Sequence, residues 1–218
     1  MNTEYRINLI SKLTIKILHL KNDFVLRVGI DGVDGSGKTI FADELTKALK
    51  AVGASVIRAS VDGFHNLRGT RYRRGRLSPE GFYLDSYNYP SLKQNLLDPL
   101  SLNGTGFYRT AMFDHKIDKA VDVPLEQAHV GDILIFDGIF IHRPELRDYW
   151  DLSIFLDVDF ENSIPRLGKR DNGPTEIHAE VNRRYIEGQL FYLRECSPAE
   201  AATMVIDNND YHHPFITR

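Results

Sequence analysis

The sequence predicts an α/β fold, with helices in the outer layers and a mainly parallel β-sheet between them. Five short runs are rich in apolar and β-branched residues, and all but the outermost lack strict alternation, as is typical of strands buried on both faces. Helical patterns lie between them, for example at residues 40–52 and 176–195. Strands that alternate with helices favour parallel pairing. The predicted strands are residues 24–30, 55–59, 133–136, 152–156 and 203–206.

Composition indicates one globular domain and excludes several classes of protein. Of the 218 residues, 42% are hydrophobic and 26% are charged, which is enough apolar material for one compact core. The 27 Lys and Arg against 30 Asp and Glu give a net charge of −3, which argues against a general nucleic-acid binder. Cys196 is the only cysteine, so one chain can form neither a disulfide nor a thiolate metal site, and a reducing, cytoplasmic location is expected.

Residues 1–22 are predicted to form an amphipathic helix ahead of a single domain at residues 23–218. Apolar residues recur at helical spacing from Leu9 to Leu20, with lysines between them. The lysines and the lack of a small-residue cleavage site argue against a signal peptide. No apolar run approaches the ~18 residues of a membrane span. We therefore expect the helix to pack against the domain rather than on a membrane.

A phosphate-binding loop is the clearest motif. Residues 32–39 read GVDGSGKT and match G-x-x-x-x-G-K-[ST] between an apolar strand and a helical pattern. Glycines let the backbone wrap around phosphates, while backbone amides and the following helix N-terminus offer partial positive charge. Lys38 adds a full positive charge, and Thr39 can place its hydroxyl on magnesium. The predicted nucleotide-binding residues are Gly32, Val33, Asp34, Gly35, Ser36, Gly37, Lys38, Thr39 and Ile40.

Two aspartates follow predicted strands and would lie near this loop. Asp137 follows strand 133–136, where a carboxylate can orient magnesium through water, although an ordinary turn aspartate would look the same. Asp62 follows strand 55–59 and would emerge at the carboxyl edge of the sheet. There it can take the proton of an attacking hydroxyl group. There are two alternatives: Asp62 only forms a turn, or His65 acts as the base in its place.

A pair of arginines indicates a lid. Arg166 and Arg170 are four residues apart in a predicted helix at 160–171, which places both guanidinium groups on one face. The Asn-Gly-Pro sequence at 172–174 then ends the helix. A lid at residues 166–184 could close over transferring phosphates and exclude water. A solvated basic helix end is the alternative.

The stretch from 64 to 130 is less regular and is predicted to be an insertion on the substrate side. It carries several turn signals and, near its start, five arginines within nine residues. Guanidinium groups suit phosphates and carboxylates, so together with Arg184 they could hold a phosphorylated substrate; a solvated loop is the alternative. The five are Arg68, Arg71, Arg73, Arg74 and Arg76.

Together these motifs resemble the uridine kinase and phosphoribulokinase branch of P-loop kinases, from about residue 24 to residue 210. The resemblance implies a three-layer α/β/α P-loop fold with a helical or irregular substrate lobe and a short lid. It also implies an ATP- and Mg²⁺-dependent kinase of a small molecule, with Asp62 as base and with Arg166 and Arg170 on the ATP phosphates. The family motifs correspond to residues 32–39, 62–65, 137–138, and 166 with 170–171.

The acceptor side departs from the uridine kinase pattern. Residues 87–90 read Tyr-Asn-Tyr-Pro where that family has Phe-Asp-His-Pro, so the resemblance gives the ribose hydroxyls to Asn88 or Asp85. Phe113 stands in place of a base-contacting tyrosine and Asp118 in place of a base-contacting histidine. Arg184 replaces a glutamine. The predicted substrate-side residues are Asp62, His65, Asp85, Asn88, Phe113 and Arg184.

Three functions are open at this stage. A nucleoside kinase acting on uridine or cytidine comes first, because the whole motif order follows that family. A kinase of a phosphorylated sugar or another acidic acceptor is its rival. A nucleotide-dependent regulatory ATPase that binds a protein partner is a different class, although no [NT]-K-x-D guanine-reading motif occurs. The resemblance also allows a homo-oligomer, for which no residue selects an interface.

Overall fold

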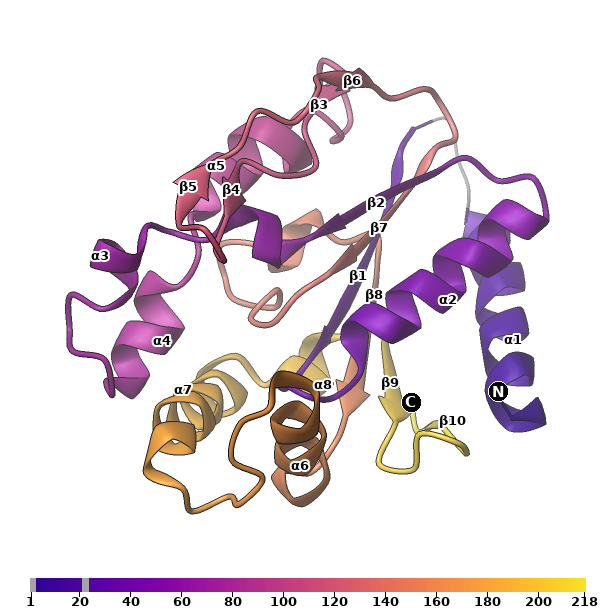
Figure 1. The fold of residues 1–218 in the computed structure, drawn as a ribbon. Helices are drawn as coiled ribbons and strands as arrows, with labels where there is room; N and C mark the ends of the chain where they lie inside the picture. The colour runs from indigo at the N-terminus through magenta and orange to yellow at the C-terminus, as the bar shows by residue number, and fades with distance from the viewer. Residues whose placement is uncertain (1–2, 21–23) are drawn as a thin grey trace.

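The computed structural model describes residues 3–20 and 24–218, and their main feature is a twisted sheet with helices on both faces (Figure 1). Within these residues the large sheet has the strand order β10-β9-β8-β1-β7-β2. All its neighbouring strands pair in parallel except β10, which is antiparallel to β9. The predicted α/β fold with a mainly parallel sheet is therefore confirmed. The strands are β1 (Leu26–Gly32), β2 (Val56–Ser60), β7 (Ile133–Asp137), β8 (Leu152–Asp157), β9 (Met204–Asp207) and β10 (Phe215–Ile216).

The five predicted strands all form, with bounds that differ by up to two residues. β7 begins at Ile133 as predicted, and all its residues are buried. β1 begins and ends two residues later than predicted, because Gly32 still pairs with Leu156 of β8. The central strand therefore runs directly into the phosphate-binding loop. β2 alternates between buried and half-buried residues, as suits a strand at the sheet edge.

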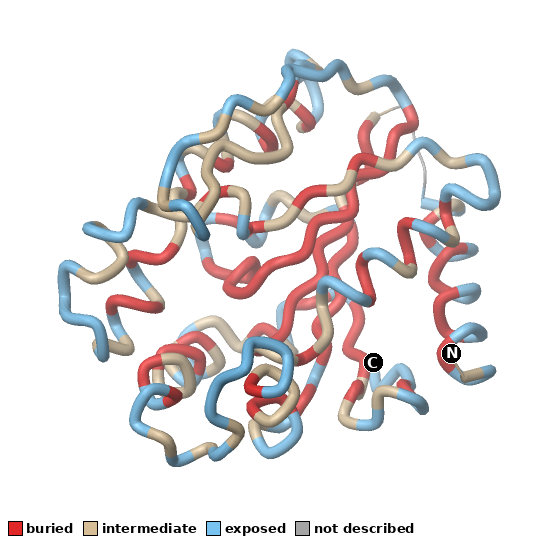
Figure 2. Tube along the Cα trace, viewed as in Figure 1, coloured by how far each residue is buried: buried red, intermediate tan, exposed pale blue. Residues whose placement is uncertain are grey.

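Helices form the two outer layers. α1 and α2 cover one face, where Leu13, Ile17 and Phe41 are among the most buried side chains. The opposite face is covered by α5 (Tyr89–Leu92), the π-helix η2 (Lys93–Leu97), α7 and α8. Figure 2 shows the buried residues concentrated between the layers. The predicted helix at 160–171 forms with the same bounds. The longer helices and α8 are α1 (Glu4–Leu20), α2 (Lys38–Ala51), α6 (Phe160–Asp171), α7 (Glu180–Cys196) and α8 (Pro198–Ala201).

The insertion at 64–130 contains more regular structure than the sequence indicated. Besides short helices, it holds two small antiparallel sheets, β3 with β6 and β4 with β5. Strands of two residues leave no periodic pattern, so they could not be predicted. Its elements and the turn before it are η1 (Val61–Phe64), α3 (Arg68–Arg71), α4 (Pro79–Asp85), α5 (Tyr89–Leu92), η2 (Lys93–Leu97), β3 (Phe107–Tyr108), β4 (Phe113–Asp114), β5 (Lys119–Ala120) and β6 (Glu126–Gln127). A further short helix, η3 (Arg147–Tyr149), precedes β8.

The N-terminal segment is helical from Glu4 and buries its apolar side. Leu9, Ile10, Leu13 and Ile17 belong to the same core cluster as α2 and the sheet. The expected boundary between residues 22 and 23 lies outside the described residues. Within the part of the chain that the structure describes, no helix has the length and apolar character needed to cross a membrane.

Candidate active site

A cavity of about 980 Å³ lies at the carboxyl ends of β1, β2 and β7. Because parallel strands end at the same edge of a sheet, residues distant in sequence meet there. Of the predicted nucleotide-binding residues, Gly32, Val33 and Ser36 do not line the cavity; Val33 is 4% exposed and Ser36 is fully buried beneath the loop. The predicted residues that do line it are Asp34, Gly35, Gly37, Lys38, Thr39, Ile40, Asp62, Asp137, Arg166 and Arg170.

The phosphate-binding loop is held in shape by close backbone packing. Gly35 has φ 77°, and a Cβ atom there would lie 2.1 Å from the carbonyl oxygen of Ser163, so only glycine fits. Lys38 Nζ donates to the carbonyl oxygens of Gly32 and Val33 at 3.0 and 2.9 Å. From α7, Gln189 Oε1 accepts a hydrogen bond from the Asp34 backbone N–H at 2.6 Å. No motif in the sequence indicated this role for Gln189.

Burial raises the pKa of the Asp34 side chain, and nearby Asp62 raises it further, while Lys38 lowers it. Asp34 lies in the loop and lines the cavity with both of these residues. The protonated form of this carboxyl group is therefore favoured more than it would be in water.

Thr39 and Asp137 form the part of the cavity that suits magnesium. Thr39 Oγ1 donates to Asp137 Oδ2 at 2.7 Å, and Arg58 forms an ion pair with Asp137 Oδ1 at 2.7 Å. Among the described residues, no group of three or more His, Cys, Asp or Glu could hold a metal ion. Mg²⁺ commonly needs only one or two protein oxygen ligands because substrate phosphates and water supply the others. One carboxylate and one hydroxyl oxygen therefore fit Mg²⁺.

Asp62 lies in η1 and faces the cavity with a free carboxylate. Its side chain makes no hydrogen bond or ion pair with any residue that the structure describes, so it is available to a substrate. Its backbone carbonyl oxygen lies 3.0 Å from His65 Nδ1. Burial lowers the pKa of His65, which outweighs the opposite effect of Asp62. His65 is thus mostly neutral at pH 7, and it lines a different cavity from Asp62.

Arg166 and Arg170, the two arginines predicted to belong to a lid, both line the main cavity from α6. Arg166 donates to the backbone carbonyl oxygens of Asn208, at 3.1 Å, and Asn209. Arg170 forms an ion pair with its neighbour Asp171 at 2.7 Å. The prediction of one shared face for the two guanidinium groups agrees with their common cavity. Arg166 is thereby tied to the loop that follows β9.

Three predicted substrate-side residues line a second, smaller cavity of about 320 Å³. His65, Asn88 and Phe113 meet there, but none of them lines the main cavity. Asn88 Oδ1 accepts a hydrogen bond from the backbone N–H of Ser91 at 3.0 Å and so caps α5. Asn88, one of the two residues expected to meet the ribose hydroxyls, therefore uses its side-chain oxygen to cap a helix.

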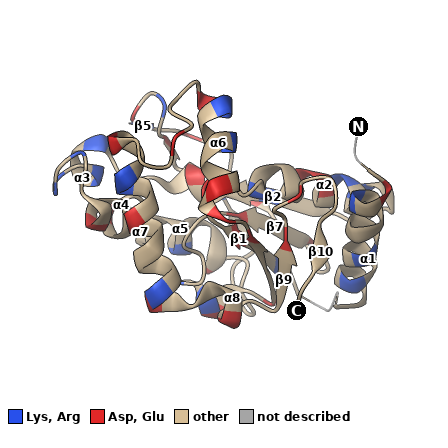
Figure 3. Ribbon diagram, turned by 90° about the horizontal axis from the view of Figure 1, so that it is seen from below, with Lys and Arg blue, Asp and Glu red and all other residues tan. Residues whose placement is uncertain are grey.

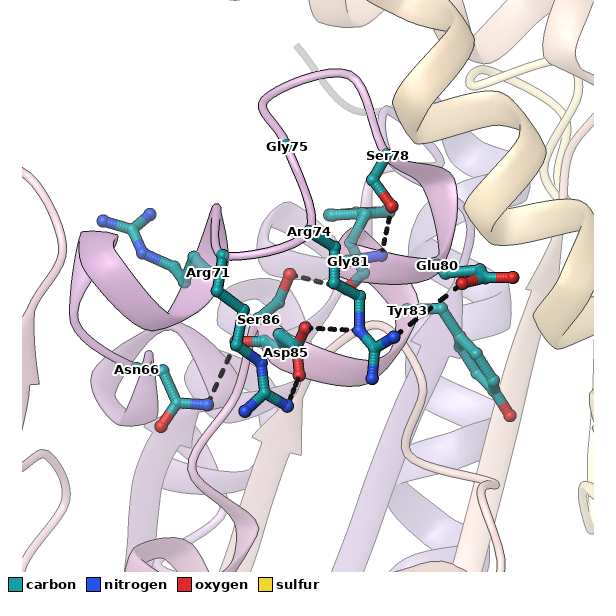
Figure 4. Close-up of polar contacts among 12 residues, drawn as sticks. Asn66, Arg71, Arg74, Gly75, Ser78, Glu80, Gly81, Tyr83, Asp85 and Ser86 are labelled. Atoms are coloured by element: carbon teal, nitrogen blue, oxygen red, sulfur yellow. Dashed lines mark hydrogen bonds and ion pairs between the residues drawn. The ribbon is translucent and has the colours of Figure 1, made fainter.

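Asp85 and Arg184 lie outside both cavities. Asp85 is 3% exposed and forms an ion pair with Arg74 at 2.9 Å (Figure 4). A second ion pair joins Asp85 to Arg73 at 2.5 Å. Arg184 is also 3% exposed. Its guanidinium group donates to backbone carbonyl oxygens between residues 71 and 78, three of them at 2.9 to 3.1 Å. In this structure both side chains hold the protein together instead of facing a ligand site.

The arginine-rich segment, residues 68–76, forms ion pairs with other parts of the folded chain. Its basic residues lie in α3 and in the turn before α4, at one end of the molecule (Figure 3). Arg71 forms an ion pair with Asp118 at 3.1 Å, and Arg73 and Arg74 share Asp85. The segment is ordered by ion pairs, so the alternative of a solvated loop describes only part of it.

Several side chains that line the main cavity were not predicted from the sequence. Tyr87, His115 and Lys116 line it together with Asp62. Tyr87 precedes the Asn88 motif, and His115 and Lys116 lie within the Phe113 motif, so the motifs marked the right segments but not the residues that face the cavity. Tyr211, after β9, also lines it.

Comparison with known proteins shows the family of this chain. The family model "Phosphoribulokinase / Uridine kinase family" matches residues 27–173, which is more than half of the chain. A pantothenate kinase of Streptococcus pyogenes serotype M5 is 29% identical over 177 residues, covering 72% of this chain and 56% of that protein. The chain thus spans little more than half the length of such curated relatives.

Solved structures share the fold over most of the chain. One described as a possible uridine kinase from Bacillus stearothermophilus has a TM-score of 0.73 at 24% identity, covering 91% of this chain and 97% of its own. D-glycerate 3-kinase from Cryptococcus neoformans has a TM-score of 0.58 at 14% identity, with 88% of each chain covered. The family match spans the phosphate-binding loop, Asp62, Asp137 and the lid arginines. With its P-loop kinase fold, the chain therefore belongs to the phosphoribulokinase / uridine kinase family.

Proposed function

We propose that this protein is an ATP- and Mg²⁺-dependent kinase that transfers the γ-phosphoryl group to a hydroxyl group of a small molecule. The observation that carries the proposal is one continuous cavity that holds Lys38, Thr39, Asp137 and the unpartnered carboxylate of Asp62. The first three are suited to a magnesium nucleotide. Asp62 is suited to an acceptor.

Each residue has a physical role in the proposed transfer. Lys38 binds phosphate oxygens, and Arg166 and Arg170 neutralise charge that spreads over the transferred group. When bound, Mg²⁺ neutralises further negative charge on the phosphates. The acceptor oxygen forms a bond to the γ-phosphorus as the β–γ bridging oxygen leaves with ADP. The proton of the acceptor hydroxyl passes to Asp62.

Two acceptor classes have specific support. The motif order and the likeness to a possible uridine kinase support uridine or cytidine. Against it, Asn88 caps a helix, and Asp85 and Arg184 are engaged in protein contacts. The names of two relatives, pantothenate kinase and D-glycerate 3-kinase, support an acceptor that carries a carboxylate as well as a hydroxyl group. Both classes are consistent with Asp62 as the base.

The test is an ATP-consumption assay with Mg²⁺ and a panel of acceptors. The panel contains uridine and cytidine, and three pairs that differ mainly in charge: ribose and ribose 5-phosphate, glycerol and D-glycerate, pantothenol and pantothenate. A control without acceptor measures hydrolysis alone. Stimulation by any of these compounds supports the proposed kinase. Turnover that no member of the panel raises above the control contradicts it and favours a regulatory ATPase.

Two variants assign the roles. Asp62→Asn should lower the turnover number by about 10²- to 10⁴-fold, as expected for loss of a general base, and leave ATP binding intact. Lys38→Ala should lower turnover and also weaken ATP binding. Asp148→Asn is the matched control, since the Asp148 side chain is 88% exposed and outside the cavity. Near wild-type turnover of Asp62→Asn would show that another group is the base.

A further inference from the structure

The hairpin formed by β4 and β5, residues 113–120, places its tip at the main cavity beside Asp62. His115 and Lys116 of the tip line the same cavity as Asp62. The His115 ring lies 4.7 Å from the His65 ring, centroid to centroid, and His65 Nδ1 lies 3.0 Å from the Asp62 carbonyl oxygen. His65 thus connects the tip to the residue that we propose as the base, Asp62.

The segment that leads into the hairpin is bonded directly to the turn that carries Asp62. The backbone N–H of Met112 donates to the carbonyl oxygen of Gly63 at 2.8 Å. A Cβ atom on Gly63 would lie 2.7 Å from the Cβ of Ala111, so the two backbones approach as closely as they do only because residue 63 is glycine. The hairpin and the turn that carries Asp62 are therefore held in a fixed position relative to each other.

The tip itself is anchored by the arginine-rich segment. Asp118 Oδ1 accepts a hydrogen bond from the Arg68 backbone N–H at 2.8 Å and forms an ion pair with Arg71 at 3.1 Å. Within the tip, Asp114 Oδ1 accepts from the Lys116 backbone N–H at 2.8 Å. The arginines that could have bound an anionic substrate are instead used, in part, to hold the hairpin.

Lys116 is the basic side chain that this arrangement leaves for a ligand. It is exposed and makes no ion pair with any residue in the described ranges 3–20 and 24–218. The other basic residues of the cavity, Lys38, Arg166 and Arg170, belong to the phosphate loop and to α6. An ammonium group next to an acceptor site favours a negatively charged partner and forms charge-assisted hydrogen bonds with it.

We propose that the acceptor carries an anionic group, a carboxylate or a phosphate, and that Lys116 binds this group while Asp62 takes the proton from the acceptor hydroxyl. This inference rests on the proposed kinase function and names the substrate class of the same site. The hairpin tip sets the distance between the charged group and the reacting hydroxyl. Nucleosides, which are neutral, would leave Lys116 without a partner.

The experiment compares Lys116→Gln with wild type on the charged and neutral members of the panel. The matched control is Lys119→Gln, which removes the same charge from an exposed side chain of the same hairpin that does not line the cavity. Loss of one charge-assisted hydrogen bond should raise KM for the charged acceptor about 10- to 100-fold. KM for ATP in Lys116→Gln, and both KM values in Lys119→Gln, should stay within about twofold of wild type, since neither involves the loss of a charge-assisted hydrogen bond.

The outcomes separate this inference from the proposed function. Phosphorylation of D-glycerate or pantothenate points to a carboxylate, and phosphorylation of ribose 5-phosphate points to a phosphate; either supports the inference when Lys116→Gln raises that KM. Phosphorylation of only uridine, cytidine or the other neutral compounds leaves the kinase function standing and overturns the inference. Equal KM values in Lys116→Gln and Lys119→Gln for a charged acceptor also overturn it. An increase in KM for ATP alone would assign Lys116 to the nucleotide instead.

Discussion

Replacing Arg6 by methionine should destabilise the protein and weaken ATP binding together. Arg6 lies in α1, is fully buried, and forms an ion pair with Glu44 of α2 at 2.8 Å. It also donates to Asn208 Oδ1 at 3.1 Å, and its guanidinium carbon lies 4.1 Å from the centre of the Tyr211 ring. Asn208 in turn donates to the carbonyl oxygen of Ser36 in the phosphate loop at 2.7 Å. The N-terminal helix is thereby connected to the nucleotide cavity.

The size of the effect follows from burial. Removing one partner of a buried ion pair costs about 3–5 kcal/mol. The Glu44 side chain keeps 16% exposure and a hydrogen bond from Tyr211, so we expect a loss near the lower limit, about 3 kcal/mol. In a domain of this size, such a loss lowers the melting temperature by about 6–12 °C. Methionine fills most of the space, so the effect reflects lost polar contacts more than a cavity.

Thermal melting and ATP titration of the same samples test this prediction. Because Tyr211 lines the cavity and Asn208 contacts the loop, Kd for ATP should rise about 5- to 10-fold, roughly 1–1.4 kcal/mol. Lys12→Met, on the exposed side of α1, is the control and should change neither quantity. A melting temperature of Arg6→Met within about 2 °C of wild type would refute the energetic reasoning. A large drop with unchanged ATP affinity would show that α1 only stabilises the fold.

Two further predictions concern buried polar contacts. Gln189→Leu should lower the free energy of unfolding in urea by about 1–3 kcal/mol, because the backbone N–H of Asp34 loses its acceptor. Gln189→Glu keeps an acceptor oxygen and should lose less, and equal losses would contradict this account. Burial raises the pKa of Asp85, but hydrogen bonds from Arg73 and Arg74 outweigh it and leave the pKa below its usual value. The folded-state pKa is then below the unfolded one, so the stabilisation by Asp85 is present above about pH 4 and disappears as the pH falls further. The melting-temperature difference between wild type and Asp85→Asn should therefore be large at pH 7 and shrink in acid, and a difference independent of pH would refute it.

The sequence predicted correctly those elements and relative positions that depend on short-range pattern and on parallel topology. The helix at 160–171 has the predicted bounds, because its pattern of polar and apolar residues and the Asn172 that ends it are local features of the sequence. The phosphate loop, Asp62 and Asp137 were placed at one cavity because each follows a strand of the same parallel sheet. The order of strands and loops along the chain is enough to determine these positions.

The same reasoning did not locate the acceptor-side residues, because their roles depend on partners distant in sequence. Arg184 contacts carbonyl oxygens more than 100 residues earlier in the chain. Asp118 belongs to a hairpin with strands of two residues, and its partner Arg71 lies 47 residues away. A motif shows which segment approaches the site. Which side chain of that segment faces a ligand depends on contacts like these, which leave no periodic signal.

Helix α7 shows why a polar pattern was hard to interpret from sequence. Its buried side is largely polar, including Asn182, Arg184 and Gln189, whereas an amphipathic helix is expected to bury apolar residues. Each of these side chains binds backbone rather than core: Asn182 donates to the Glu176 carbonyl oxygen at 2.8 Å, and Gln189 accepts from the phosphate loop at 2.6 Å. Loops have backbone groups that must be paired when they are buried. A helix that packs on the connection between α6 and α7, on the arginine-rich segment and on the phosphate loop therefore requires polar residues on its inner side. From sequence alone, that side looks like one that faces water.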